Sequence, residues 1–174
     1  PVTVIVNGDV TDEPDETFTV DLTSPVNATI ADNQGMGTIT DDDAAPAISI
    51  DDVTVTEGNT GTVNAAFTVS LSQASAQTVT VDYATTDGTA TAPGDYTALT
   101  LTTLSFAPGT TSLPVTVIVN GDVTDEPDET FTVDLSSPVN ATIADNQGLG
   151  TITDDDAAPA ISIDDVTVTE GNTG

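Results

Sequence analysis

The sequence has 174 residues but no lysine, arginine, histidine, cysteine or tryptophan. Without basic side chains it cannot neutralise phosphate groups, which excludes nucleic acid and direct contact with anionic membranes. Without cysteine it forms no disulfide and has no thiol chemistry. The usual catalytic nucleophiles, bases and phosphate-binding groups are therefore missing, and we expect the chain not to be an enzyme.

Acidic residues, in contrast, are abundant. The 29 aspartates and glutamates give a formal net charge of −29. Such a charge is typical of disordered chains, but 37% of the residues are hydrophobic and they fall in regular alternating blocks. This patterning favours a folded chain.

One long repeat dominates the sequence. Residues 1–61 recur as residues 114–174, and only Thr23/Ser136 and Met36/Leu149 differ. A period of 113 residues is too long for a solenoid unit and matches a self-sufficient domain. We therefore expect a tandem head-to-tail array. Its parts are the C-terminal part of one module (1–46), a complete module (47–156), and a linker with the first strand of the next module (157–174).

The complete module has the pattern of a β-sandwich. Apolar and polar residues alternate between turn residues, and no stretch has helical spacing. The predicted strands are 47–56 (interrupted), 63–71, 79–83, 99–106, 113–119, 131–135 and 150–153. Asp87-Gly88 is a hairpin signal. Seven short strands in about 100 residues predict an all-β, Ig-like antiparallel sandwich. Its expected large core side chains are Phe67, Tyr83, Phe106 and Phe131.

The acidic residues of this module gather at strand ends. Because strand directions alternate, the end of the first strand, the turn after the third, the connection before the sixth and the end of the seventh meet at one pole. The groups are Glu57; Asp87; Asp122, Asp125, Glu126, Asp128 and Glu129; and Asp154, Asp155 and Asp156. Two carboxylates about 4 Å apart repel by roughly 4 kcal/mol at an effective dielectric of about 20. At neutral pH the cluster therefore requires protons or a cation.

Calcium is the cation that suits such a cluster. It takes about six to eight oxygen ligands and tolerates irregular loops, whereas zinc, copper and iron sites normally include histidine or cysteine. Taken singly, each group also has an ordinary structural interpretation: a turn at Asp87, a solvated loop at 122–129 and a charged spacer at 154–156. The convergence of all the groups at one pole favours calcium.

Several short motifs resemble a known family. They are Val55-Thr56-Glu57-Gly58, Val81-Asp82-Tyr83, Thr86-Asp87-Gly88-Thr89-Ala90, Gly94-Asp95-Tyr96, Phe106-Ala107-Pro108-Gly109, Asp125-Glu126-Pro127-Asp128-Glu129-Thr130-Phe131 and Gly150-Thr151-Ile152-Thr153-Asp154-Asp155-Asp156. With these motifs the complete module resembles the Calx-beta family, found in sodium–calcium exchangers, an integrin cytoplasmic tail and large bacterial surface proteins.

The resemblance implies a set of calcium ligands. In the complete module they are Glu57, Asp87, Asp122, Glu126, Glu129, Asp154, Asp155 and Asp156. In the incomplete modules they are Asp9, Glu13, Glu16, Asp41, Asp42, Asp43 and Glu170. Gly121 stands where tighter calcium-sensing members have another acid, so we expect about two or three ions per module.

Together these features predict a calcium-rigidified extracellular structural repeat: a stalk, spacer or filament component of a bacterial surface adhesin or matrix fibre. Its expected partners are neighbouring modules, and other copies if chains form a fibre. The last aspartates also begin the short linker (154–159, and 41–46 before it), so calcium would fix the angle between modules. An adhesive module that recognises glycan or another surface is the alternative. Threonine-rich strand faces permit it, but no exposed aromatic cluster marks such a site.

Overall fold

Alternating side chains build the strands, as the sequence pattern predicts. In the computed structural model, which describes residues 1–172, β5 (Gly61–Leu71) buries Ala65, Phe67 and Val69 and exposes most of the residues between them. The same alternation runs along β9 (Ser112–Gly121). Branched side chains pack well on such pleated surfaces, which favours strands over helices. Among residues 1–172 no helix is long and apolar enough to cross a membrane.

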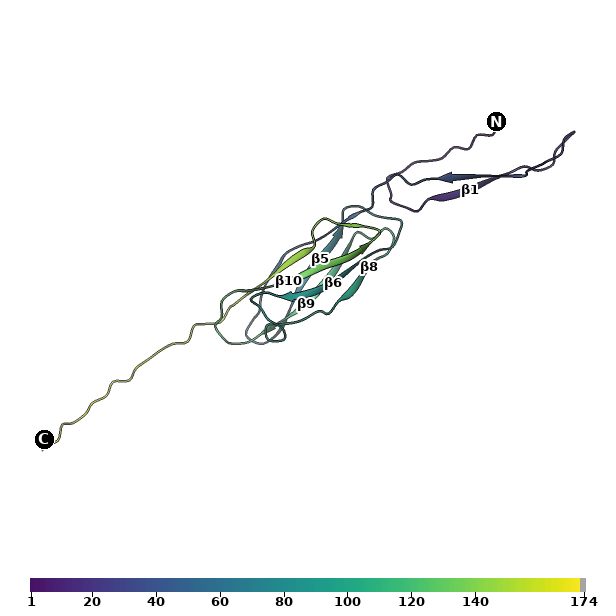
Figure 1. Ribbon diagram of the computed structural model, residues 1–174. Helices are drawn as coiled ribbons and strands as arrows, with labels where there is room; N and C mark the ends of the chain where they lie inside the picture. Colours follow the sequence, from purple (N-terminus) through teal and green to yellow (C-terminus); the bar gives the residue numbers. More distant parts are fainter. Residues whose placement is uncertain (173–174) are drawn as a thin grey trace.

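Two five-stranded sheets pack face to face around one core (Figure 1). The first sheet has the strand order β4-β12-β10-β6-β8, and the second has the order β11-β3-β5-β9-β7. The remaining bounds are β3 (Ala47–Ile50), β4 (Val53–Thr56), β6 (Val79–Asp87), β7 (Tyr96–Thr97), β8 (Thr102–Phe106), β10 (Glu129–Val139), β11 (Thr142–Ile143) and β12 (Gln147–Thr153). The predicted all-β sandwich is confirmed.

The interrupted first strand is shared between the two sheets. β3 pairs antiparallel with β5, whereas β4 pairs parallel with β12 in the other sheet. A second parallel pair joins β11 to β3. The sandwich is antiparallel apart from these two pairs. The two-residue strands β7 and β11 add to the seven predicted strands, because such short runs contain no alternation to detect.

Three of the four predicted aromatic residues form the centre of the core. Phe67, Phe106 and Phe131 are fully buried. The prediction for Tyr83 was wrong, since it is only half-buried at the margin of the core. Tyr96 takes the central place instead: its ring stacks on Phe131 with centroids 4.6 Å apart. Tyr96 belongs to β7, which the sequence pattern does not reveal.

The hairpin predicted at Asp87-Gly88 does not form. β6 pairs with β8, but between them the chain crosses to the other sheet, where β7 pairs with β9. The Asp-Gly pair therefore begins a crossover between the two sheets. This crossover brings residues 88–97 to the pole at which β9 ends.

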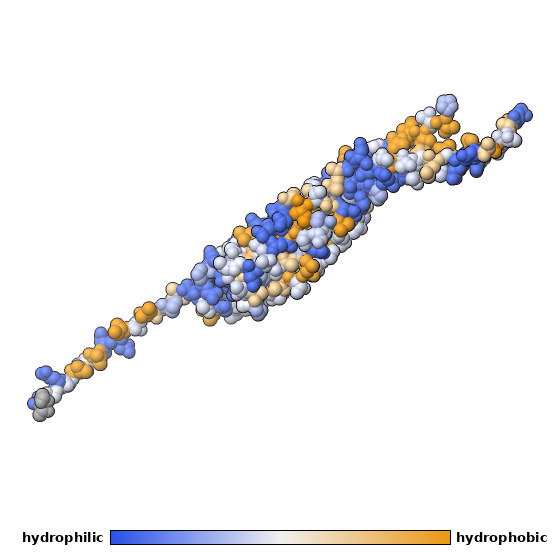
Figure 2. All heavy atoms as spheres, in the orientation of Figure 1, coloured by the Kyte–Doolittle hydropathy of each residue, from blue (hydrophilic) through white to orange (hydrophobic). Residues whose placement is uncertain are grey.

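The flanking segments repeat the sequence of the sandwich but only part of its structure. β1 (Glu16–Asp21) and β2 (Gln34–Ile39) pair in the register of β10 and β12. The hairpin and the C-terminal segment leave opposite ends of the sandwich (Figure 1). Figure 2 shows hydrophilic residues gathered where the hairpin meets the sandwich. In the segment before the hairpin, hydrophobic residues such as Val4 and Ile5 are exposed.

Candidate metal centre

Two parallel strands bring the first acidic residues together. β4 ends at Thr56 and β12 ends at Thr153, and these residues are partners in the parallel pair. Their hydroxyl groups lie 2.9 Å apart and form a hydrogen bond. Glu57 and Asp154 follow directly, so the two acidic side chains leave the sheet side by side.

Glu57, Asp154 and Asp156 form the first acidic group. One carboxylate oxygen of each lies within 4.8 Å of the others. Glu57 is only 5% exposed. Among the described residues, the buried oxygens Asp154 Oδ1 and Asp156 Oδ2 have no hydrogen-bond partner. Unpartnered buried carboxylate oxygens are costly, so this group fits a cation that accepts oxygen ligands.

Burial and neighbouring carboxylates both disfavour the charged forms of this group. Burial raises the pKa of Glu57 to about 7, with further contributions from Asp122, Asp154, Glu126 and Asp156. Burial and the surrounding carboxylates also raise the pKa of Asp156, although Asn59 donates a hydrogen bond to it. The structure therefore brings Asp122 and Glu126 to the same pole as the first group.

Asp95, Glu126 and Glu129 form a second acidic group with the same close spacing. Burial raises the pKa of Glu129 to about 7, and the carboxylate of Asp95 adds to this. Asp95 is missing from the predicted ligands because β7 escaped detection. Its backbone carbonyl accepts a hydrogen bond from Asn120 N–H at 2.8 Å, which holds it at the end of β9. The motif Gly94-Asp95-Tyr96 was the available signal.

Besides Asp122, which lies near the first group without belonging to it, three predicted ligands outside the N-terminal copy belong to neither group. Asp87 Oδ1 accepts hydrogen bonds from the Tyr96 hydroxyl at 2.6 Å and from Ala92 N–H at 3.1 Å, and these bonds lower the pKa of Asp87. Asp155 is exposed and accepts a hydrogen bond from Gly58 N–H at 3.1 Å. Glu170 is exposed in the C-terminal segment, whose described residues, 154–172, form no strand. Their role as ligands stays a prediction.

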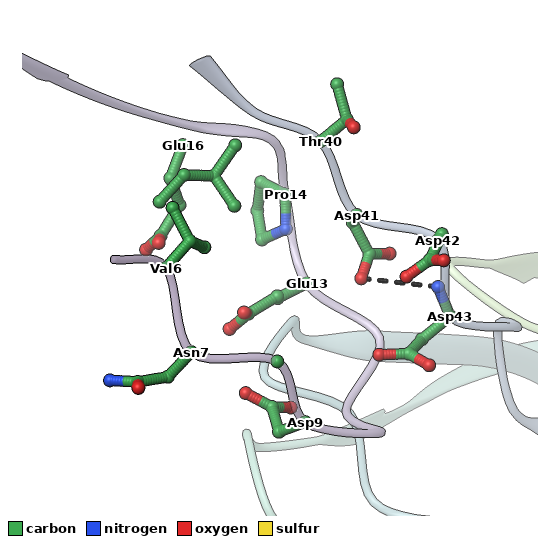
Figure 3. A pocket seen from close by; sticks show the side chains of 12 residues that line it. Val6, Asn7, Asp9, Glu13, Pro14, Glu16, Thr40, Asp41, Asp42 and Asp43 are labelled. Carbon is green, nitrogen blue, oxygen red and sulfur yellow. Dashed lines mark hydrogen bonds between the residues drawn. The ribbon is translucent and has the colours of Figure 1, made fainter. Parts of the chain in front are cut away.

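The N-terminal copy of this pole gathers all six of its predicted residues. A pocket of about 210 Å³ is lined by Asp9, Glu13, Glu16, Asp41, Asp42 and Asp43. Figure 3 shows Asp9 and Glu13 on one side of it and the three consecutive aspartates on the other. Burial and the neighbouring acids raise the pKa of both Glu13 and Asp43. The acidic residues of this copy therefore also converge.

Gly121 cannot be replaced by an acid without a shift of the backbone. A Cβ atom at this position would lie 2.0 Å from the carbonyl oxygen of Gly58 and 2.7 Å from that of Glu57. The end of β9 therefore passes directly against the segment that follows β4. An acidic side chain at this position would therefore require the two segments to move apart.

Comparisons with known proteins agree with this architecture. A model of the Calx-beta domain matches residues 1–43 and 41–165. The apo-form Calx CBD1 domain is 28% identical, with a TM-score of 0.52, and the match covers 63% of this chain and 99% of CBD1. No curated protein sequence matches the chain.

Two longer solved structures are also similar. CBD12 from CALX1.2 is 26% identical over 63% of this chain, with a TM-score of 0.57. CBD12 of CALX1.1, which is named a calcium binding domain, is 27% identical over 71% of this chain, with a TM-score of 0.56. The chain spans 46% and 54% of these two proteins, about half of their length.

The matched residues include the sandwich, the N-terminal hairpin and the acidic pole of each. The family match covers most of the chain, and the solved relatives share its fold. The chain belongs to the Calx-beta domain family.

Proposed function

We propose that the chain is a calcium-rigidified structural repeat that acts as a stalk, spacer or filament component outside the cell. The proposal rests chiefly on the buried group of Glu57, Asp154 and Asp156, in which two carboxylate oxygens have no partner among the described residues. The same aspartates lead directly out of the sandwich, so an ion held there sits at the start of the connection to the next module.

Calcium fits the available ligands best. Both acidic groups offer oxygen atoms only, and the chain has no histidine or cysteine that would favour a softer metal. The named calcium binding domain of CALX1.1 has a similar fold and supports this choice. The proposed ligands are Glu57, Asp122, Glu126, Glu129, Asp154 and Asp156 together with Asp95, with Asp87 and Asp155 at the margin of the site.

Rigidity would follow from charge neutralisation. Without a cation, the carboxylates at each pole repel one another, and this repulsion favours loops and linkers that spread apart. Bound calcium supplies positive charge where the chain has none of its own. Because each pole adjoins a linker, we infer that calcium stiffens the junctions and turns a flexible string of modules into a rod.

The proposed location is the cell surface or a matrix outside it, in line with the resemblance to large bacterial surface proteins. Sites built on extracellular modules are typically weak and rely on abundant calcium, which suits a chain that lacks disulfides. The proposed partners are neighbouring modules and, in a fibre, other copies of the chain. No catalytic role is proposed.

Small-angle X-ray scattering tests this function. The full chain is measured in excess calcium and in excess chelator, with magnesium as the control ion. We expect a narrower range of shapes and a smaller spread of maximum dimensions in calcium, together with a higher melting temperature, because a ligand that binds only the native state stabilises it. Scattering profiles that superimpose in calcium and in chelator would contradict the proposal.

A further inference from the structure

Asp12 is buried although it belongs to a loop of the N-terminal segment. It is 6% exposed, and it lies against Ser75, which is 3% exposed. The Ser75 hydroxyl donates to Asp12 Oδ2 at 2.7 Å, and Gln77 Nε2 approaches the same oxygen at 3.4 Å. The backbone joins in, because Ala76 N–H donates to the Asp12 carbonyl at 3.0 Å. A short parallel bridge therefore links residues 12 and 75.

The residues that contact Asp12 lie between β5 and β6. The same segment also contacts the linker and the start of β3. Gln73 Nε2 donates to the Ala44 carbonyl at 2.6 Å, and Ser72 Oγ accepts from Ala47 N–H at 2.9 Å. Pro46, between these two contacts, is fully buried. Residues 72–77 therefore hold the preceding segment at two separate points.

The second copy of the same loop shows how the contact with Ser75 affects the burial of Asp12. Asp125 has the same sequence neighbours as Asp12 but is exposed. Residue 12 faces the complete sandwich that follows its own module, whereas the described residues that follow the sandwich of Asp125, 154–172, form no strand. Identical loops thus differ in burial according to whether residues 72–77 of a following sandwich are present. The burial of Asp12 is a property of the junction and not of the loop alone.

We propose that residues 72–77 are the docking surface by which each module receives the acidic loop of the module before it, with Asp12 as the residue that sets their relative angle. The proposed partner is a preceding copy of the same module. The carboxylate suits this role because a hydroxyl and an amide donor converge on it, and charge-assisted hydrogen bonds are stronger and more directional than neutral ones.

The proposed docking surface rests on the proposed function, and it identifies the contact between modules that stiffens each junction. Asp12 lies between Asp9 and Glu13, and both of these line the acidic pocket. A cation held by those residues would order the backbone that presents Asp12 to Ser75. Asp12 itself stands outside the pocket lining and acts through its contact with the next sandwich.

The test uses the full chain with an additional copy of residues 47–113 placed before Pro1, which completes the first module. The chain has no cysteine, so spin labels can be attached at Met36→Cys and Leu101→Cys, two exposed positions on opposite sides of the junction. Pulsed electron spin resonance then measures the distance distribution between the labels in calcium. The variants are Asp12→Ala and Ser75→Ala, with Asp125→Ala as the matched control in an identical loop that docks onto no following sandwich.

We expect a narrow distribution in the parent chain and in Asp125→Ala. In Asp12→Ala and Ser75→Ala it should become about twice as wide, because relative motion is the default for domains joined by small interfaces. Unchanged melting temperatures would show that both variants still fold. Equal widths in Asp12→Ala and the parent chain, or a broad distribution in the parent chain in calcium, would overturn the docking surface. A parent distribution that is equally narrow in chelator, with Asp12→Ala still broad, would remove calcium from the proposed function and leave the docking surface standing.

Discussion

The Tyr96 hydroxyl donates a hydrogen bond to Asp87 Oδ1 at 2.6 Å, while its ring stacks on Phe131 at 4.6 Å between centroids. Tyr96 thus joins the centre of the core to the acidic pole. Ala92 N–H also donates to Asp87 Oδ1, so the other carboxylate oxygen lies outside this pair of bonds. Asp87 therefore fixes the crossover between the sheets whether or not it also binds an ion.

The first prediction concerns the ionisation of Tyr96. Burial, followed by the hydrogen bond to Asp87, raises the pKa of Tyr96 to about 12 from an ordinary value of 10.0. Asp87→Asn removes the negative charge and should lower the pKa of Tyr96 without restoring the ordinary value, because burial remains. Tyrosinate absorbance, measured with Tyr83→Phe so that one tyrosine titrates, gives the midpoint.

The sign of the accompanying stability change is fixed by the same pKa. Between pH 10 and about pH 12 the native state keeps the Tyr96 proton, whereas the unfolded chain loses it. The contribution of Tyr96 to the free energy of unfolding therefore falls as pH rises through this range. Asp145→Asn, in an exposed loop at the other end of β12, is the charge-matched control. A tyrosinate midpoint that is the same in Asp87→Asn and in this control would refute the assignment.

The second prediction is that Glu57→Gln has opposite effects with and without calcium. In chelator, the substitution removes a buried charge that four neighbouring carboxylates repel, so the melting temperature should rise. In calcium, it removes a ligand and should abolish most of the calcium-dependent stabilisation, which is about 2.7 kcal/mol when free calcium is 100 times its Kd.

Thermal unfolding of Glu57→Gln and Asp145→Asn in both conditions separates a ligand from a general charge effect. Asp145→Asn also removes one negative charge, but away from both acidic groups. It should leave the gain in melting temperature on addition of calcium unchanged. If Glu57→Gln retains the full gain, Glu57 is not a ligand.

The third prediction is that the stability of the calcium-free chain depends on pH in the opposite direction to that of the calcium-bound chain. The pKa values of Glu57 and Glu129 are raised to about 7 from 4.5, so between these values the native state binds more protons than the unfolded state. Stability in chelator should therefore fall as pH rises from about 4.5 to about 7. In saturating calcium the trend should oppose this, because the ligands must lose their protons to bind.

Urea unfolding at pH 5 and pH 7 measures this effect directly. In chelator, the midpoint should be higher at pH 5 than at pH 7. The variant Glu57→Gln with Glu129→Gln should lose most of the difference. A midpoint that is higher at pH 7 in chelator would show that other groups dominate and that these two carboxylates do not carry the repulsion.

Alternation was sufficient to predict the long strands, because burial on one face leaves a period of two in the sequence. It could not reveal β7, whose two residues have no period, and so Tyr96 was not predicted in the core and Asp95 was not predicted as a ligand. The convergence of the acidic groups could be predicted from the order and direction of the strands. Which oxygens approach one another depends on the crossover between β6 and β8, which only the structure shows.

Repeated sequence also sets a limit on what local pattern can determine. Val2 and Val115 occupy the same place in identical stretches, yet Val2 is 71% exposed and Val115 is 2% exposed. Val115 lies in β9, which pairs with β5, whereas no strand forms around Val2. Asp12 and Asp125 differ for the same reason. The neighbouring residues in the sequence predict neither difference in burial, because each depends on whether a segment distant in the sequence packs against the residue.

The fourth prediction tests the close approach of Gly121 to the segment after β4. In Gly121→Ala the new Cβ would meet backbone carbonyl oxygens at Glu57 and Gly58, which cannot rotate away as a side chain can. We expect a loss of about 1–3 kcal/mol in the free energy of unfolding, as is usual when an extra group enters a tightly packed site. Calcium affinity should also fall, because the backbone that presents Glu57 must move.

Gly8 provides the matched control, since it has the same sequence neighbours and no atom lies within 4 Å of the place where its Cβ would be. Gly8→Ala should change the free energy of unfolding of the sandwich by much less than Gly121→Ala. Urea unfolding and calorimetric calcium titration of the two variants measure both quantities. Equal effects would mean that the loss reflects glycine's backbone freedom in this loop sequence, whereas a loss confined to Gly121→Ala would identify steric contact with the metal pole as the reason that no acid occupies this position.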